Sequence, residues 1–250
     1  MTTLIICSID DARFNQTAQM YRRFWPVDQL QTLHIKSPRS LAQGYNQGLA
    51  VAGGDNIILS HDDIEILSPD LAQRVSTHLS HFDIVGVAGT TLLGHPRWLQ
   101  AGPPHIFGQV AHPDPEVAGY VVDIYSASCR VVGSIQALDG VFLAMRREVA
   151  QAIKFDEATF DGFHLYDLDF TFRAYQAGFK LAVACDIQLL HHSIGNYDDT
   201  WKEYGRRFLD KHLSRLSPMP PKNFLWAWAK VSGKDQIREV MTPIVWDEPE

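Results

Sequence analysis

Acidic and histidine side chains gather at three places in the chain, each beside an apolar run or a turn. They are His61, Asp62 and Asp63; Asp167 and Asp169; and His191 and His192. Carboxylate oxygens together with imidazole nitrogens can hold a divalent cation, and imidazole suits Mn²⁺ as well as Mg²⁺. A carboxylate at the start of a helix, facing the same ion, could accept a proton from an attacking hydroxyl. A metal ion and a base together are the groups that transfer from a diphosphate ester needs.

Each cluster also has a purely structural interpretation. Aspartates are favoured in turns and ahead of helices, which would account for residues 61–63. Acidic side chains interact favourably with the dipole at a helix start, which would account for residues 167 and 169. Histidines at a strand end can bond to backbone groups, which would account for residues 191 and 192. The combination of all three clusters favours the chemical interpretation.

The segments that carry these clusters alternate between strand-like and helix-like patterns. Apolar runs predict strands at 3–9, 30–35, 56–60 and 83–89, and helix-period patterns follow them, which is typical of an α/β domain with a mostly parallel sheet. Residues 61–63 then follow the carboxyl end of a buried strand, where open α/β sheets usually bind ligands.

Capping residues set the expected helices. Ser40 with Gln43 forms a capping box for the helix that ends near residues 53 and 54. Ser68 and Pro69 begin a helix that runs to about residue 79, and a further helix at 166–177 ends at Gly178.

Two segments lack clear periodicity. Residues 90–120 are rich in Gly, Pro and His, which predicts a long loop that is functional or mobile. A proline cluster near residue 218 separates a domain at 1–214 from an appendage at 215–250. Trp226, Trp228 and Trp246 of this appendage could pack on the domain, on another copy or partner, or on a membrane surface.

Bulk composition narrows the class of protein. The 250 residues, 46% hydrophobic and 20% charged, are enough for one folded domain with a sizeable core. A formal net charge of −7 without basic clusters argues against nucleic acid as the main partner. The three cysteines lack CxxC spacing, and the chain shows no targeting or membrane-spanning pattern, so we expect a cytoplasmic protein.

Several motifs in order resemble family 2 glycosyltransferases of the GT-A fold. They are LAQGYNQGLAVAGGDNIILSHDD (41–63), ALDGVFLAMRREV (137–149), and FDEATFDGFHLYDLDFTFRAYQAGFK (155–180). The FDE, GFH-x-YD-x-D and HHSIG pieces look closest to the glycosyltransferase-like branch named after the streptomycin biosynthesis protein StrF. The resemblance covers roughly residues 4–196. It implies the α/β GT-A (nucleotide-diphospho-sugar transferase) fold, with a single Rossmann-like mixed sheet flanked by helices.

The resemblance also implies an activity, which is inverting transfer of a sugar from a nucleoside-diphosphate sugar to a saccharide or other hydroxyl acceptor. Asp167 falls on the catalytic acid of the family and would take the proton of the acceptor. Mn²⁺ or Mg²⁺ would be held by His61, Asp63, and His191 or His192. Donor contacts are expected from Ser8, Asp10, Asn46, Asp62 and Gly140, and Trp98 could stack on a sugar.

The sequence departs from the family pattern at three points. His61 stands at the first position of the DxD motif, and Tyr166 replaces the usual Glu before Asp167. The acid that often holds the nucleotide base is missing from HIKSPRS (34–40).

Two rival functions stay open. One is a metal-dependent hydrolase that activates water with His61, Asp62, His191 and His192. The other is a non-catalytic module that keeps the GT-A fold and binds a nucleotide or glycan, which the departures at residues 61 and 166 would suit. An NAD-dependent Rossmann enzyme is disfavoured because no GxGxxG follows the first strand, and no P-loop, HExxH or GxSxG is present.

Overall fold

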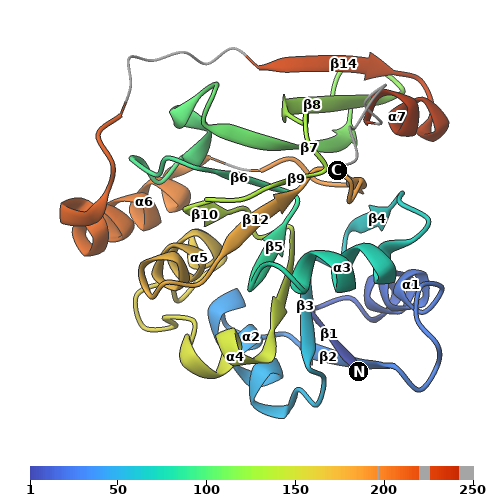
Figure 1. Ribbon diagram of the computed structural model, residues 1–250, viewed down its shortest axis with the longest axis horizontal. Coiled ribbons are helices and arrows are strands. Elements are labelled where there is room, and N and C mark those ends of the chain that lie inside the picture. Colours follow the sequence, from blue (N-terminus) through green and yellow to red (C-terminus); the bar gives the residue numbers. More distant parts are fainter. Residues whose placement is uncertain (196, 220–225, 242–250) are drawn as a thin grey trace.

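The computed structural model describes residues 1–195, 197–219 and 226–241. Its strands form two sheets, one near the N-terminus and one stacked beyond it (Figure 1). The order in the first sheet is β2 (Leu30–Lys36), β1 (Thr2–Ser8), β3 (Asn56–Ser60), β11 (Phe142–Arg146), β5 (Ile84–Gly86), β12 (Leu181–Ala184) and β9 (Val131–Val132). β1 is parallel to both of its neighbours, whereas β11 runs antiparallel to β3 and β5.

The second sheet is built mainly from the middle and the end of the chain. Its main path is β10 (Ala137–Leu138), β6 (Ala88–Thr90), β7 (Ile106–Pro113), β13 (Leu189–His191) and β4 (Ile64–Ile66), while β8 (Tyr120–Ser126) pairs with β7 and with β14 (Ala227–Val231). The mixed α/β fold expected from the sequence is confirmed, but the single expected sheet is two.

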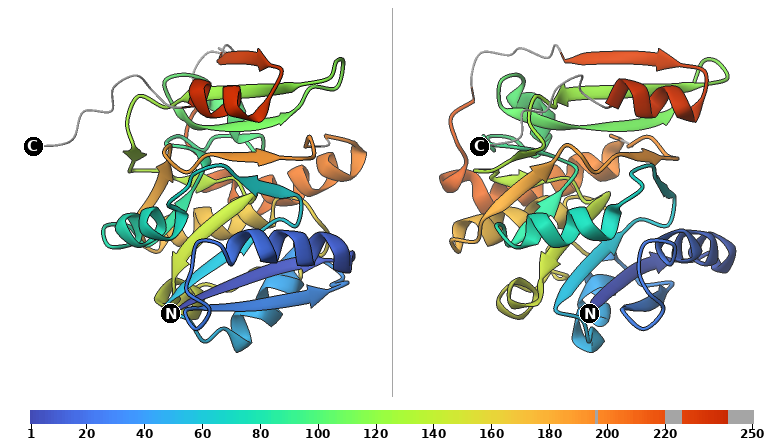
Figure 2. Two further views of the ribbon diagram at one scale, coloured as in Figure 1. Left: turned by 90° about the vertical axis from the view of Figure 1, so that its right-hand side faces the viewer. Right: turned by 45° about the vertical axis from the view of Figure 1, so that its right-hand side comes forward.

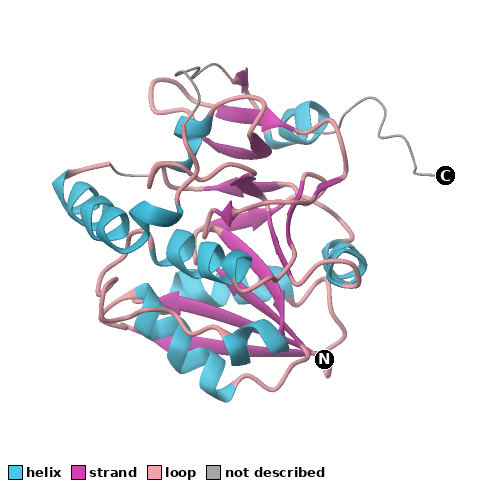
Figure 3. Ribbon diagram, turned by 60° about the vertical axis from the view of Figure 1, so that its left-hand side comes forward, coloured by secondary structure: helices cyan, strands magenta, loops and turns pink. Residues whose placement is uncertain are grey.

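Helices cover both faces of the first sheet because its central strands alternate apolar side chains between two cores. Leu4 and Ile6 of β1 pack with α1 (Asp11–Tyr21) and α3 (Leu71–Leu79). Ile5 points to the other face, where α2 (Leu41–Val51), α4 (Arg147–Ala152) and α5 (Tyr166–Gln176) lie. Figure 2 shows α1 and α2 on opposite sides of β1, and in Figure 3 most helices surround this sheet.

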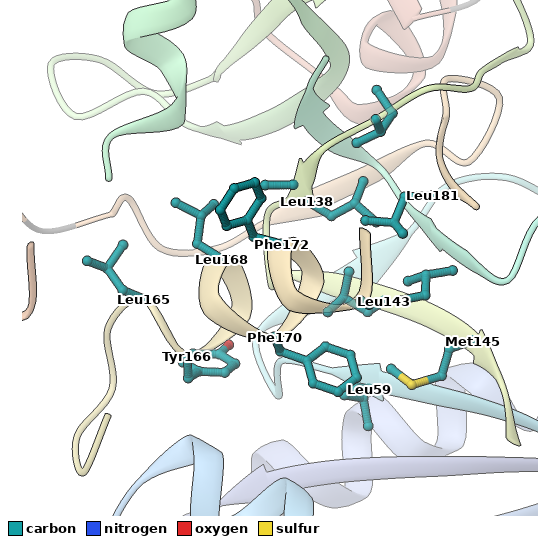
Figure 4. Packing of buried hydrophobic residues seen from close by; sticks show 14 of the residues in the cluster. Leu59, Leu138, Leu143, Met145, Leu165, Tyr166, Leu168, Phe170, Phe172 and Leu181 are labelled. Atoms are coloured by element: carbon teal, nitrogen blue, oxygen red, sulfur yellow. The ribbon is translucent and has the colours of Figure 1, made fainter. Parts of the chain in front are cut away.

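Helix α5 carries the predicted catalytic acid and is held by a large apolar cluster. Leu168, Phe170 and Phe172 are almost wholly buried, and Figure 4 shows Phe170 beside Leu59 and Phe172 on the side of Leu138. Such burial of three large side chains fixes the start of α5 relative to β3 and β10.

Two of the predicted elements differ in detail from the structure. The run 83–89 is not one strand but β5 and β6, which belong to different sheets. The segment 90–120, predicted as a loop, contains a 3₁₀ turn (η1, Trp98–Ala101) and the eight-residue strand β7. Its strand pairs with β6, β8 and β13, and these distant pairings supply the stability that local periodicity does not signal.

The third helix begins later than its capping residue suggests. Ser68 does not cap α3, because its hydroxyl donates to the carbonyl of Asp186 and accepts the N–H of Gln188. The helix starts at Leu71, and Ser68 instead joins the end of β4 to the turn before β13.

The described part of the segment 215–250 packs on the domain. β14 pairs antiparallel with β8, and α7 (Lys234–Met241) buries Ile237 and Met241 against Ala111 and Val122. The remaining helical segments are α6 (Asp199–His212) and η2 (Leu213–Arg215), and Trp246 lies outside the described residues. None of the helices described, over 1–195, 197–219 and 226–241, has the length and apolarity to cross a membrane.

The glycine pattern of α2 is explained by packing against β1. A Cβ atom on Gly48 would lie 2.5 Å from Cγ2 of the fully buried Ile5, whereas one on Gly205 of α6 would have no neighbour closer than 3.7 Å. Gly48→Ala should lower the free energy of unfolding by about 1–3 kcal/mol through overpacking. Gly205→Ala, the matched control, should be neutral or stabilise by up to about 1 kcal/mol, because alanine favours helix. Urea unfolding of both variants measures the difference, and equal stability would contradict this account of Gly48.

Candidate active site

The pairing of β4 with β13 joins the first and third polar clusters. Ile64 of β4 lies opposite His191, and the N–H of His192 donates to the carbonyl of Asp63 at 2.8 Å. His61 follows the end of β3 and donates its N–H to the carbonyl of Val141 at 3.2 Å. Backbone pairing alone therefore fixes the segment 61–63 beside the end of β13.

Three side chains converge there with the spacing of a metal site. Nε2 of His191 lies 3.3 Å from Oδ1 of Asp63, Nδ1 of His61 lies 3.9 Å from the same oxygen, and the two ring nitrogens are 3.4 Å apart. Atoms bound at about 2.1 Å to one ion lie roughly 3.0–3.6 Å apart, so the set fits a divalent cation with little adjustment. Two imidazoles and one carboxylate also leave coordination positions open for a ligand.

The protonation states of Asp63 and His61 at neutral pH favour metal binding. Although burial by itself raises the pKa of Asp63, hydrogen bonds and charges of His191, with Ser193, lower it well below its usual range. Burial, reinforced by His191, lowers the pKa of His61. The set therefore offers an ionised carboxylate and a neutral His61 ring, which are the ligand forms that metals require.

Tyr166 contacts the His61 ring of this set. Its hydroxyl lies 3.1 Å from Nε2 of His61, on the side of the ring away from Asp63 and His191. Metal-binding histidines are commonly oriented by such a partner on the second ring nitrogen. The Tyr that replaces the usual Glu of the family therefore contacts the His that replaces the usual Asp.

His192 lies apart from the converging set. Its ring is 44% exposed, and Nε2 lies 3.8 Å from Oε2 of Glu65. Because successive side chains of a strand point to opposite faces, His191 and His192 cannot both face Asp63. The structure thus selects His191 from the pair that the sequence proposed.

Asp167 lies in the first turn of α5 against the turn before β11. Its Oδ2 accepts the N–H of Gly140 at 2.7 Å, and a Cβ on Gly140 would come within 2.6 Å of Cβ of Asp167. Asp139, the residue before this glycine, faces the same space. Burial, reinforced by the negative charge of Asp139, raises the pKa of Asp167 to about 7. A carboxyl with such a pKa is suited to general base chemistry near neutral pH.

One cavity of about 450 Å³ connects the predicted base with the metal set. Its lining includes His61, His191, Asp139, Gly140 and Asp167. Aromatic side chains form much of the remaining wall; they include Trp98, Tyr125, Tyr166, Tyr197, Trp201 and Trp226. The cavity is large enough for a small ligand and places all these groups on one surface.

Of the five predicted donor contacts, Gly140 lines this cavity, while Ser8, Asp10, Asn46 and Asp62 do not. The Ser8 hydroxyl donates to Oδ2 of Asp62, and this bond links the carboxyl ends of β1 and β3 outside the cavity lining. Asp10 caps α1, where Oδ1 accepts the N–H of Ala12 at 2.8 Å. These bonds account for Ser8 and Asp10 without a ligand.

Asn46 has a structural role in the folded chain. Its amide donates to the carbonyl of Phe155 at 2.9 Å and accepts the N–H of the same residue at 3.0 Å. Both hydrogen-bonding ends of the side chain are therefore used, and Asn46 fixes the FDE segment against α2. Its contact with the donor stays a prediction, and the sequence did not signal the structural role because residue 155 approaches α2 only in the folded chain.

Asp169 is also structural. It is fully buried, and its carboxylate binds Arg173, Lys211 and His212, with Oδ1 lying 2.8 Å from Nε2 of His212. This ionic cluster ties α5 to α6 and leaves Asp167 as the acid of α5 that reaches the cavity.

The model of the "Glycosyltransferase like family" matches residues 3–212 of the chain. The chain belongs to this family. Among solved structures, the mannosyltransferase PcManGT from Pyrobaculum calidifontis, in complex with GDP-Man and Mn²⁺, is similar with a TM-score of 0.54 and 12% identity, over 88% of this chain and 66% of that one. At that identity the likeness shows the GT-A fold alone. A197 from STIV matches with a TM-score of 0.42 and 11% identity, over 79% of this chain and 99% of that one. No curated protein matches the chain.

Sequence reasoning missed three polar groups in the cavity of this glycosyltransferase-like chain. Asp139 directly precedes Gly140, which was singled out, so the acid before the turn glycine was a usable signal. His112 and Asp123 lie on β7 and β8, and they meet only because these strands pair across residues predicted to form a loop. No local pattern marks them.

The raised pKa of Asp167 predicts how the stability of the glycosyltransferase-like protein depends on pH. A carboxyl whose folded pKa of about 7 exceeds its ordinary value of 3.8 stabilises the fold at low pH and loses that contribution as pH rises through 7. Asp167→Asn removes the cost of the ionised group, so it should raise stability at pH 8, by up to about 4 kcal/mol, and much less at pH 4. Thermal unfolding at both pH values measures this difference. Asp28→Asn, at an exposed turn, is the control, and a gain that is independent of pH would contradict the assignment.

Proposed function

We propose that the protein is a glycosyltransferase that moves a sugar from a nucleoside-diphosphate sugar to an acceptor hydroxyl, with inversion at the anomeric carbon. One observation carries the proposal: the cavity that contains Asp167 also reaches His61 and His191. A proton acceptor and a cation-binding set on one surface are what transfer from a diphosphate ester needs.

Asp167 acts as the base in this proposal. The acceptor hydroxyl gives its proton to the carboxylate as its oxygen attacks the anomeric carbon. The new glycosidic C–O bond forms while the C–O bond to the diphosphate breaks, and the diphosphate leaves with the electron pair. The hydrogen bond from the Gly140 N–H orients the carboxylate, and burial keeps it basic enough to take a proton near pH 7.

His61, Asp63 and His191 would hold the cation. A bound Mn²⁺ or Mg²⁺ would neutralise the charge that develops on the leaving diphosphate. Tyr166 orients the His61 ring, so the two departures from the family pattern support one another. The structurally similar mannosyltransferase was solved with GDP-Man and Mn²⁺, which makes GDP-mannose the first donor to test.

Two finer assignments belong to the same proposal. The GFH-x-YD-x-D and HHSIG motifs support a place in the StrF-like branch. Ser8 and Asp62 lie at the carboxyl ends of β1 and β3, where open α/β sheets bind ligands, and this supports their predicted contact with the donor.

Nucleotide binding tests the metal assignment. Mn²⁺ with at least one of GDP, UDP, ADP, CDP or dTDP should raise the melting temperature by about 3–6 °C at a nucleotide concentration tenfold above Kd. Asp63→Asn should abolish this increase, because it removes the ionised ligand. Glu65→Gln is the matched control, since Glu65 lies two residues away and pairs with Lys234 outside the set. Equal stabilisation of the wild type and Asp63→Asn would refute the site.

Turnover separates the rival functions. Release of nucleoside diphosphate that requires an added acceptor indicates transfer, whereas release in its absence at the same rate indicates a hydrolase. Nucleotide binding without turnover, unchanged in Asp167→Asn, indicates a binding module.

A further inference from the structure

The cavity is lined, beyond the catalytic end, by three aromatic rings from distant parts of the chain. Trp98 lies in η1, Tyr125 in β8, and Trp226 directly before β14. The ring centroids of Trp98 and Tyr125 are 5.3 Å apart at 81°, and those of Tyr125 and Trp226 are 5.6 Å apart at 66°. We call these three residues the aromatic wall.

Carboxylates fix both ends of the aromatic wall. The Trp98 indole N–H donates to Oδ2 of Asp139 at 3.3 Å, and that of Trp226 donates to Oδ1 of Asp123 at 2.9 Å. The other oxygen of Asp123 lies 2.8 Å from Nε2 of His112. The rings are therefore held by packing and by hydrogen bonds, which prepares them for binding a ligand without reordering.

The aromatic wall begins at the catalytic end and leads away from it. Asp139, which binds Trp98, precedes Gly140, whose N–H binds Asp167. Tyr125 and Trp226 follow at successive ring contacts. A sugar ring that reacts at Asp167 would thus meet Trp98 first, while Trp226 lies beside whatever is attached to that ring.

The polar groups beside the aromatic wall suit hydroxyls. His112 and Asp123 both line the cavity. The hydrogen bond to Asp123 raises the pKa of His112, and the pair places an imidazole and a carboxyl group side by side. Aromatic faces with nearby donors and acceptors match a pyranose, which has an apolar C–H face and a rim of hydroxyls. Because Asp123 already pairs with His112 and Trp226, the site suits a neutral sugar better than an ammonium ligand.

We propose that the aromatic wall is a second sugar subsite, which binds the ring next to the reacting one, so that the acceptor is a glycan of at least two rings. The inference rests on the proposed function for the order of the two rings. It gives the C-terminal segment a role, since the pairing of β14 with β8 sets Trp226 in the cavity wall.

Trp228 provides a matched control on the same strand. It lies two residues after Trp226, pairs with Asp123 in the β14–β8 ladder, and is 60% exposed. It is not part of the cavity lining among the described residues. Loss of either tryptophan removes the same side-chain type from the same segment, and Trp226 alone contacts the subsite.

Saturation-transfer NMR with defined sugars tests the proposal. The probes are maltose, cellobiose, lactose, chitobiose and α-1,2-mannobiose, each beside the methyl glycoside of its reducing-end monosaccharide, with choline as an ammonium probe. At least one disaccharide should receive saturation on both rings and bind tighter than its monosaccharide. Trp226→Ala should weaken that disaccharide about tenfold, which corresponds to about 1.4 kcal/mol. Trp226→Phe should weaken it less, and Trp228→Ala should bind within twofold of the wild type.

Three results would overturn the inference. No disaccharide receives saturation, choline alone binds, or Trp226→Ala and Trp228→Ala weaken disaccharide binding equally. An unchanged melting temperature of Trp226→Ala shows that its loss of binding is not misfolding, and retention of binding by Trp226→Phe shows that an aromatic ring is what the disaccharide needs. If disaccharides fail while Mn²⁺-dependent nucleotide binding is present, the second subsite is wrong and the proposed function stands. If disaccharides bind while no nucleotide does, the glycosyltransferase proposal fails and the sugar subsite stands.

Discussion

Two short strands, β4 and β13, pair at one edge of the second sheet with Ile64 opposite His191. This pairing joins the segment after β3 to a segment about 130 residues later, and it sets Asp63 and His191 3.3 Å apart. Ser68 strengthens the connection by bonding to the turn before β13. Without this pairing the chain would carry the same polar residues, but their side chains would not converge.

Asp167, the proposed base, is positioned by a second constraint, which is close packing of α5 against the turn at Gly140. A side chain on residue 140 would occupy the space of Asp167 and of the Tyr166 hydroxyl. The same packing buries Asp167 next to Asp139, and the raised pKa is the electrostatic consequence. Ionised Asp167 destabilises the fold locally, and burial of the apolar residues of α5 offsets that cost.

The second sheet explains why the cavity extends beyond His61, His191 and Asp167. β7 and β8 bring His112 and Asp123 together, and β14 extends the same sheet so that Trp226 faces Tyr125. The family model ends at residue 212, so Trp226 and β14 lie beyond the matched region, whereas Trp98 and Tyr125 lie within it. Matched and unmatched segments therefore both contribute to one cavity.

The sequence by itself determined the features that depend on neighbouring residues. A buried apolar run followed by a polar triplet placed His61 and Asp63 at a strand end, and caps placed Ser40 and Gly178 at helix ends, because these preferences act over a few residues. Tertiary structure decided that His191 rather than His192 faces Asp63, that Asn46 binds Phe155, and that β5 and β6 enter different sheets. Strand register and side-chain direction follow from pairing between segments far apart in the chain, and local periodicity contains no record of those partners.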